Sequence, residues 1–428
     1  MRDCSTWITV AAALAAVALP AADVGAAGPE GEGAVLATYA DIAETAYEDA
    51  WLTAKDLQGA VDALLAAPGA PTHQAAKDAW LAARVPYQQT EAYRFGNAIV
   101  DDWEGQVNAW PLDEGLIDYV AAAYGTESDE NLHYVANVIA NPKLVSGGEE
   151  IDAAVIDAEL VQSLHEIDEV EANVATGYHA IEFLLWGQDL NGTGPGAGVR
   201  PWTDFALDAC TGGNCERRRA YLRTVTDLLV ADLEEMVGNW RPDGAARTQI
   251  VESPPGRGLS SMVIGLGSLS YGELAGERMK LGLLLRDPEE EHDCFSDNTH
   301  NSHYYDALGI ANVYLGRYAR TDGSTVEGAS LSDLVRTADP ALDAEMHTRL
   351  DATLAAMRAL KDTADRGEMA YDQMLAEDNP EGNALVQAAI DALLEQTRTI
   401  ERIVAALDLG PLEFEGSDSL DAPEAVFQ

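Results

Sequence analysis

The sequence predicts an all-α protein, and two observations lead to this fold class. Apolar residues recur at three- and four-residue spacing over long stretches, which is the period of a helix. No comparably long stretch alternates polar and β-branched residues, as a half-buried strand does. The helices expected from this period cover 39–66, 73–95, 151–185, 217–237, 260–285, 304–315, 343–363 and 384–407.

Residues 1–26 are expected to form a secretory signal peptide. Arg2 precedes an apolar run from Trp7 to Leu19, and small residues follow up to Ala27. The run is short for a membrane span, and no later segment approaches the ~20 uninterrupted apolar residues that a span requires. Because Cys4 precedes the run, it is not the lipidated cysteine of a lipoprotein. We therefore expect an exported protein, periplasmic or in the cell envelope, without a transmembrane span.

Breaks in the helical period divide the rest of the chain. Proline and glycine interrupt the period near the middle of the chain, most clearly at Pro254-Pro255-Gly256. We expect an N-terminal helix bundle over 27–240, a linker over 241–258 and a C-terminal helix bundle over 259–410, with a cleft between the bundles. Gly410-Pro411 ends the last helix. Residues 411–428 are acidic and nearly aperiodic, so a disordered tail is expected.

Three cysteines remain after the expected cleavage. Cys210 and Cys215 flank a turn-forming Thr-Gly-Gly-Asn segment, and an oxidising compartment would let them pair. Closing so short a loop stabilises the fold by only about 2 kcal/mol, so the bridge would order a loop. Cys294 is left over, either buried or free.

The chain is strongly acidic, with a formal net charge of -47 over 428 residues. Such a charge repels phosphate groups, which argues against nucleic acid and anionic membranes as partners. The charge could guide cations to a site, or it could form a well-hydrated surface suited to saline surroundings. The second interpretation is favoured, because the acidic residues are spread along the whole chain.

The candidate site lies in the segment from Gly177 to Trp186. His179 and Glu182 are three residues apart in a stretch with helical character, so their side chains share one face and can offer a nitrogen and an oxygen to one metal ion. The alternative is a side-chain hydrogen bond or a solvated face, which is the commoner role of such a pair.

The chain also resembles the imelysin-like family, which includes proteins called insulin-cleaving membrane protease and iron-regulated protein A. The resemblance begins with Gly-x-His-x-x-Glu followed by Leu-Leu-Trp. It extends to further blocks in chain order, at 84–96, 108–119, 268–279, 295–300 and 312–318. It implies two halves resembling four-helix bundles, and a role in iron acquisition or proteolysis.

The resemblance also implies further metal ligands, since stable sites draw three or more from the protein. Two of the matching blocks contain Glu91 and Asp113, and related periplasmic iron-uptake components share this pattern. We therefore expect a mixed site of His179, Glu182, Glu91 and Asp113. Without the resemblance, Glu91 is better explained as a helix ion pair with Arg94, and Asp113 as a turn or capping residue.

Three functions remain open on the sequence. The first is an exported metal-binding protein for iron acquisition or envelope metal handling, with iron favoured, zinc open, and an envelope iron-transport component as a partner. The second is a metallopeptidase that uses the same site, although the zinc-protease motif His-Glu-x-x-His is absent from the sequence. The third is a metal-free interaction protein in which His179 and Glu182 only stabilise a helix contact.

Overall fold

The computed structural model describes residues 29–128, 131–146 and 148–427, so the predicted signal peptide lies outside the described residues. The described part is mainly helical, which confirms the predicted fold class, and it adds two short β-hairpins. Within these residues, no helix combines the length and the apolar character needed to cross a membrane.

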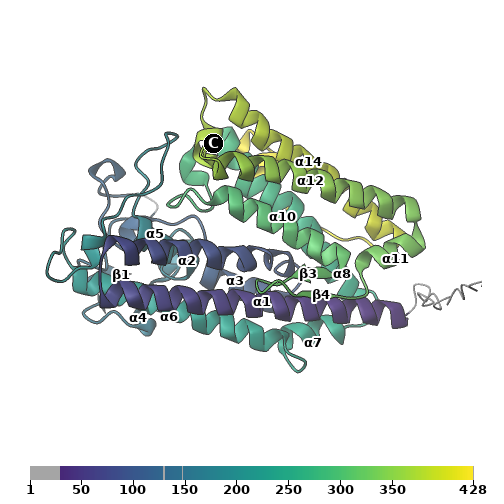
Figure 1. Cartoon of the computed structure of the whole chain (residues 1–428), viewed down its shortest axis with the longest axis horizontal. Coiled ribbons are helices and arrows are strands. Elements are labelled where there is room, and N and C mark those ends of the chain that lie inside the picture. The colour runs from purple at the N-terminus through teal and green to yellow at the C-terminus, as the bar shows by residue number, and fades with distance from the viewer. Residues whose placement is uncertain (1–28, 129–130, 147, 428) are drawn as a thin grey trace, which may run out of the picture.

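The N-terminal half is a bundle of four helices that pack on one another. These are α1 (Pro29–Ala66), α2 (Ala70–Gln88), α5 (Gly177–Trp186) and α6 (Cys215–Trp240), with α1 and α6 running along the long axis of the molecule (Figure 1). Shorter helices complete this half: η1 (Glu91–Tyr93), α3 (Ala98–Asn108), η2 (Glu114–Leu116), η3 (Ala122–Tyr124), α4 (Ala158–Leu164), η4 (Ile167–Glu169), η5 (Trp202–Phe205) and α7 (Ala245–Val251). Since α7 falls inside the expected linker, that segment is partly helical.

The C-terminal half packs four long helical segments around its own centre. One of them is continuous and consists of α8 (Arg257–Ser268), the π-helix η6 (Leu269–Leu281) and α9 (Gly282–Leu285). The others are α10 (Thr299–Leu315), α12 (Pro340–Asp365) and α14 (Pro380–Ala406), and the short helices η7 (Pro288–Glu290), α11 (Leu331–Ala338) and α13 (Tyr371–Leu375) lie in the connections.

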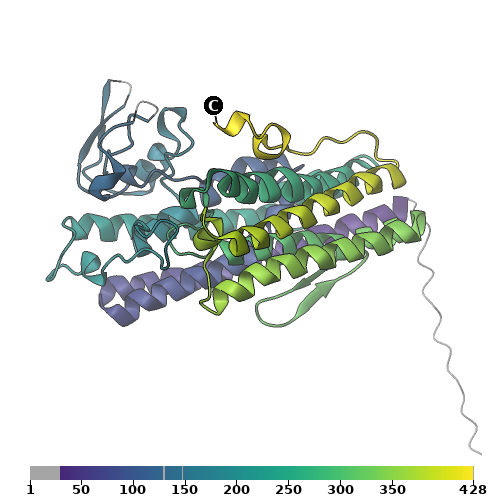
Figure 2. The ribbon, with the colours of Figure 1, turned by 90° about the horizontal axis from the view of Figure 1, so that it is seen from above.

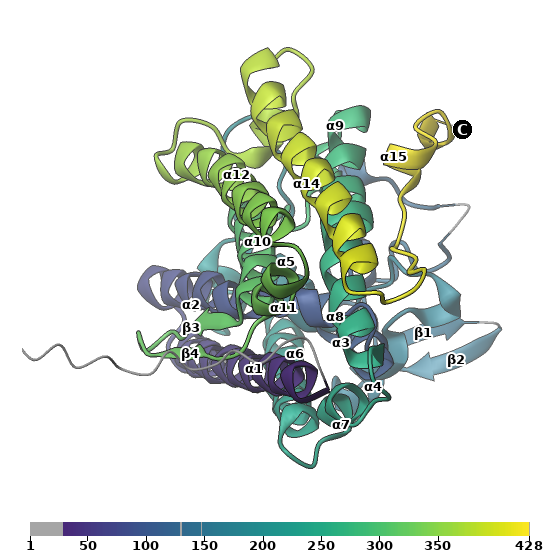
Figure 3. The same cartoon turned by 90° about the vertical axis from the view of Figure 1, so that its right-hand side faces the viewer.

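The two halves share an interior. Helix α10 packs against both α2 and η1 of the N-terminal half, and the buried apolar side chains of both halves form one contiguous cluster. The two bundles can be followed in Figure 3, which looks along the long axis. Polar groups that lie between α2, α5 and α10 are therefore enclosed by both halves.

Helices α12 and α14 begin a few residues before the predicted apolar periods, because a capping residue and a first turn precede the first apolar residue. Asp339 accepts hydrogen bonds from the backbone amides of Ala341 and Leu342, and Pro340 occupies the first position of α12. Asn379 caps α14 in the same way, ahead of Pro380. A side-chain acceptor followed by proline satisfies the free amides of a first turn and presets its backbone.

The predicted helix over 151–185 is wrong in its first two thirds. Strands β1 (Lys143–Ser146) and β2 (Glu149–Asp152) form an antiparallel hairpin with Leu144 opposite Ile151, and α4 ends at Leu164. Left-handed backbone at Glu166, Asp168 and Glu169 then turns the chain before α5. The apolar spacing of α4 and α5 imitates one helix, because both bury a face in the same core. A second hairpin pairs β3 (Arg317–Ala319) with β4 (Thr325–Glu327).

The expected disordered tail is also wrong for its described part, 411–427. This segment contains α15 (Asp418–Asp421) and η8 (Ala425–Phe427), and it runs back along the outside of η6 (Figure 2). The backbone amide of Glu415 donates to Ser268 Oγ over 3.0 Å, and Ser419 Oγ donates to the carbonyl of Gly276 over 3.0 Å. Glycines on the C-terminal half let residues 411–427, which we call the C-terminal strap, approach closely. The order of the strap therefore depends on residues that are distant in the sequence.

The predicted disulfide is confirmed. Cys210 and Cys215 are bonded, with their Cα atoms 5.9 Å apart, and Cys294 is free and half-buried. The bridge closes the turn directly before α6, as the spacing of the two cysteines suggests.

Candidate metal centre

Helix α5 carries the predicted pair into the interior of the protein. All ten of its residues are buried. Its first residue, Gly177, has a φ of +77°, and a side chain there would collide with the carbonyl oxygen of Val107 in α3. Glycine therefore lets α5 start against the end of α3, a backbone conformation that other residues adopt only at a cost.

A loop between α9 and α10 closes over α5 and carries a second group of ligands, His292 and Asp293. Trp110 Nε1 donates to the carbonyl of Glu291 over 2.7 Å, and the amide of Ser296 donates to Glu182 Oε1 over 2.9 Å. The loop is thus attached to both Trp110 and α5. It brings residues of the C-terminal half next to His179 and Glu182 of the N-terminal half.

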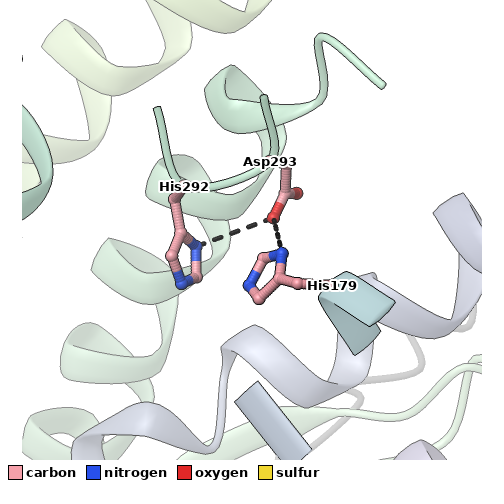
Figure 4. Close-up of side chains that lie close together, drawn as sticks. All are labelled: His179, His292 and Asp293. Atoms are coloured by element: carbon pink, nitrogen blue, oxygen red, sulfur yellow. Dashed lines mark ion pairs between the residues drawn. The ribbon is translucent and has the colours of Figure 1, made fainter. Parts of the chain in front are cut away.

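His179, His292 and Asp293 come together at this contact (Figure 4). Each offers one ligand atom, and these atoms all lie within 4.8 Å of one another. Asp293 Oδ1 is 4.0 Å from His179 Nδ1 and 3.6 Å from His292 Nδ1, and the two imidazole rings are 4.8 Å apart at their centroids. All three residues are buried. Two nitrogens and an oxygen at this separation can converge on one ion after small side-chain movements.

Asp293 is held in place by its other partners. Arg84 of α2 donates from Nη2 to Asp293 Oδ1 over 2.7 Å, while Asn298 and Ser302 donate to Oδ2. Burial alone would raise the pKa of Asp293, but Arg84 and these hydrogen bonds bring the pKa below its ordinary value. Asp293 is therefore an ionised carboxylate with a fixed orientation, and an incoming metal ion would share it with Arg84.

Both histidines are held neutral. Burial, with Arg84 as the next cause, lowers the pKa of His179 to about 3. Burial and the charge of Arg278 lower the pKa of His292 well below its ordinary value. Neutral imidazole is the form that binds metals. His179 Nε2 is buried and has no hydrogen-bond partner among the described residues, so this nitrogen is free to bind a ligand.

Glu182 supports His179. Its Oε2 lies 3.0 Å from His179 Nδ1, and both side chains are buried. Burial and the neighbouring Asp293 raise the pKa of Glu182 well above its ordinary value, which favours the protonated form. Metal binding would release this proton, so Glu182 can serve either as a ligand or as the group that orients the imidazole.

Glu91 does not join this group. It lies on η1 and is buried, and its Oε2 is 2.6 Å from Nη2 of Arg278 on η6. Glu273 and Asp306 contact the same guanidinium at 2.7 and 3.1 Å. The structure therefore gives Glu91 an ion-pair partner in the other half, instead of Arg94 as the local spacing suggests. Its predicted role as a metal ligand has no geometric support.

Asp113 lies in a cavity that opens onto His179. The cavity has a volume of about 410 Å³, and its lining includes His179, Asp113, Glu114 and Trp110. Asp113 Oδ2 accepts a hydrogen bond of 2.5 Å from Asn131 Nδ2. Asp113 is therefore at the approach to the site, and its role as a direct ligand stays a prediction.

Sequence reasoning missed His292 and Asp293. They lie three and two residues before the block 295–300, which the resemblance had already singled out. A histidine and an aspartate next to such a block were the available signal, but neither local periodicity nor spacing ties them to α5. His303, which lies in α10, is buried and packs edge-on against Tyr371 at 5.0 Å.

The fold and this site together define a class of protein: two helix bundles with buried histidine and carboxylate groups where the halves meet. The imelysin family model matches residues 43–400, and the chain belongs to this family.

Known proteins agree with this assignment. Iron-regulated protein A of Synechococcus elongatus is 37% identical over 79 residues, which cover 18% of this chain and 22% of that protein. The chain therefore matches less than a quarter of that relative's length. A crystal structure of an iron-regulated protein A precursor from Parabacteroides distasonis is similar with a TM-score of 0.62 and 19% identity, covering 91% of this chain and 98% of that chain. A crystal structure of an imelysin-like protein from Psychrobacter arcticum is similar with a TM-score of 0.56 and 18% identity, covering 89% of this chain and 96% of that chain. At these identities the structural likeness shows the fold alone.

Proposed function

We propose that this chain is an exported metal-binding protein that takes part in iron acquisition or envelope metal handling. The observation that carries the proposal is the buried group of His179, His292 and Asp293, whose ligand atoms lie within 4.8 Å of one another. The unpartnered Nε2 of His179 supports it, because a buried polar atom without a partner is costly unless a ligand satisfies it. The N-terminal export pattern and the names of the relatives support the setting.

Iron is the favoured ion. Imidazole nitrogen with carboxylate oxygen suits iron and zinc, and no thiolate stands in the group to favour copper(I). Glu182 would complete the ligand set as a fourth group. Arg84 partly neutralises Asp293, so an ion would compete with Arg84 for this carboxylate.

A metallopeptidase is the second candidate, favoured by one observation. The cavity reaches His179, and Glu182 lies beside it, so a metal-bound water would have within reach a carboxyl group that could act as a base once metal binding had released its proton. In the third candidate function, a metal-free interaction protein, the same histidines would be structural.

The test is calorimetric titration of the mature chain with ferrous, ferric and zinc ions, run beside a peptide-cleavage assay. We expect His179→Ala and His292→Ala each to weaken ferrous binding at least about tenfold. His347→Ala is the matched control, because His347 is 46% exposed on α12 and lies outside the group. Binding without cleavage supports metal acquisition, and cleavage lost with His179 supports the peptidase. Absence of binding for every ion refutes the metal site and leaves the interaction protein.

A further inference from the structure

The cavity beside His179 has an acidic lining. Asp113, Glu114, Glu289 and Glu290 all line it, and the described residues of its wall include neither lysine nor arginine. In the described part of the chain, none of these four carboxylates forms an ion pair. These four carboxylates therefore lack the arginine partners that neutralise the buried carboxylates nearby.

The lining runs from solvent to the metal centre. Glu289 is exposed, Asp113 is half-buried, Glu114 is 5% exposed, and His179 is 1% exposed at the inner end. His179 lines the cavity, and its Nε2 lacks a hydrogen-bond partner in the described structure. The carboxylates thus lead toward an atom that can bind a metal.

The size of the cavity fits a hydrated ion. Six waters at about 30 Å³ each occupy roughly 180 Å³, and the cavity measures about 410 Å³. Trp110, Tyr124 and Tyr134 form part of the wall, and the two tyrosine rings stack at 4.2 Å between their centroids.

We infer that this cavity is an entry vestibule that captures the metal as a free, hydrated cation and excludes anionic metal chelates. The inference rests on the proposed function and adds to it the chemical form of the cargo. Gathered carboxylates raise the local concentration of cations and their association rate by roughly 10 to 1,000-fold, and they repel anions by the same field.

The experiment is stopped-flow binding of ferrous ion to the mature chain, followed by the quenching of tryptophan fluorescence under anaerobic conditions. The test variant is Glu289→Gln/Glu290→Gln. Its matched control is Glu234→Gln/Glu235→Gln, which removes the same charge from an adjacent pair exposed on α6. We expect the test variant to bind about tenfold more slowly at low salt, with a dissociation rate within twofold of the parent. The control should bind at the parent rate. The difference in association rate between the test variant and the parent should shrink at high salt, because screening shortens the range of electrostatic attraction.

A second arm offers ferric citrate, an anionic chelate, in place of the free ion. We expect the parent to take up no iron from it on the timescale of ferrous binding. Equal ferrous rates in the test variant and the parent, or rapid uptake from ferric citrate, would overturn the vestibule while leaving the metal centre intact. If the parent binds no ferrous ion at all, both proposals fail together. Circular dichroism of each variant checks that the fold is unchanged.

Discussion

Replacing Glu91 with alanine tests whether this residue is a metal ligand or a structural ion-pair partner. Glu91 Oε2 is 2.6 Å from Arg278 Nη2, and both side chains are almost fully buried. Removing one member of a buried pair costs 3–5 kcal/mol, because the remaining charge loses its compensation. Arg278 keeps Glu273 and Asp306 at 2.7 and 3.1 Å, so the loss should fall near the lower end, at about 3 kcal/mol.

The assay is urea unfolding of the protein, followed by circular dichroism, with ferrous affinity measured on the folded protein. Glu91→Gln is the matched variant, since it keeps the shape and a hydrogen-bond acceptor and should lose about half as much stability. We expect ferrous affinity of Glu91→Ala within about threefold of the parent. His179→Ala should show the opposite pattern, with lost binding and little change in unfolding. A Glu91→Ala protein that unfolds like the parent but loses ferrous binding would refute the ion-pair assignment and restore Glu91 as a ligand.

Two further predictions concern groups that support α5. His73 is buried, its Nε2 lies 2.8 Å from the carbonyl of Leu185, and burial lowers its pKa to about 4. Since the folded state binds the proton less well than the unfolded state, this stability is complete above about pH 6.5 and is lost as pH falls through 6.5 toward 4. The parent should therefore lose about 2 kcal/mol between pH 7 and pH 5 that His73→Gln does not lose in parallel urea titrations, and identical pH profiles would contradict this. Gly177→Ala should lower the free energy of unfolding by at least about 2 kcal/mol and weaken ferrous binding several-fold, because the new methyl group meets Val107 at a φ of +77°. Parent-like unfolding of Gly177→Ala would show that α5 can shift without cost.

Local patterns predicted most of the helices. The apolar periods located α2, α6, α10, α12 and α14 to within several residues, and α1 except for its first ten residues, because a helix that buries one face must repeat its apolar residues every three to four positions. The same rule failed over 151–176. There the apolar residues of α4 continue the spacing of those in α5, because both helices bury a face in the same core. It also failed at the C-terminal strap, since Phe414 and Ser417 owe their packing to glycines far away in the sequence.

The candidate site, too, was predicted only in part from local patterns. The sequence by itself determined that His179 and Glu182 are neighbours, because three residues of helix place two side chains on one face regardless of the surroundings. Tertiary structure alone decided their further partners. It brought Asp293 to Arg84 across 209 residues and gave Glu91 to Arg278 across 187. Such contacts depend on how two bundles dock, and docking is set by the summed packing of many side chains, so no spacing within one segment can report it.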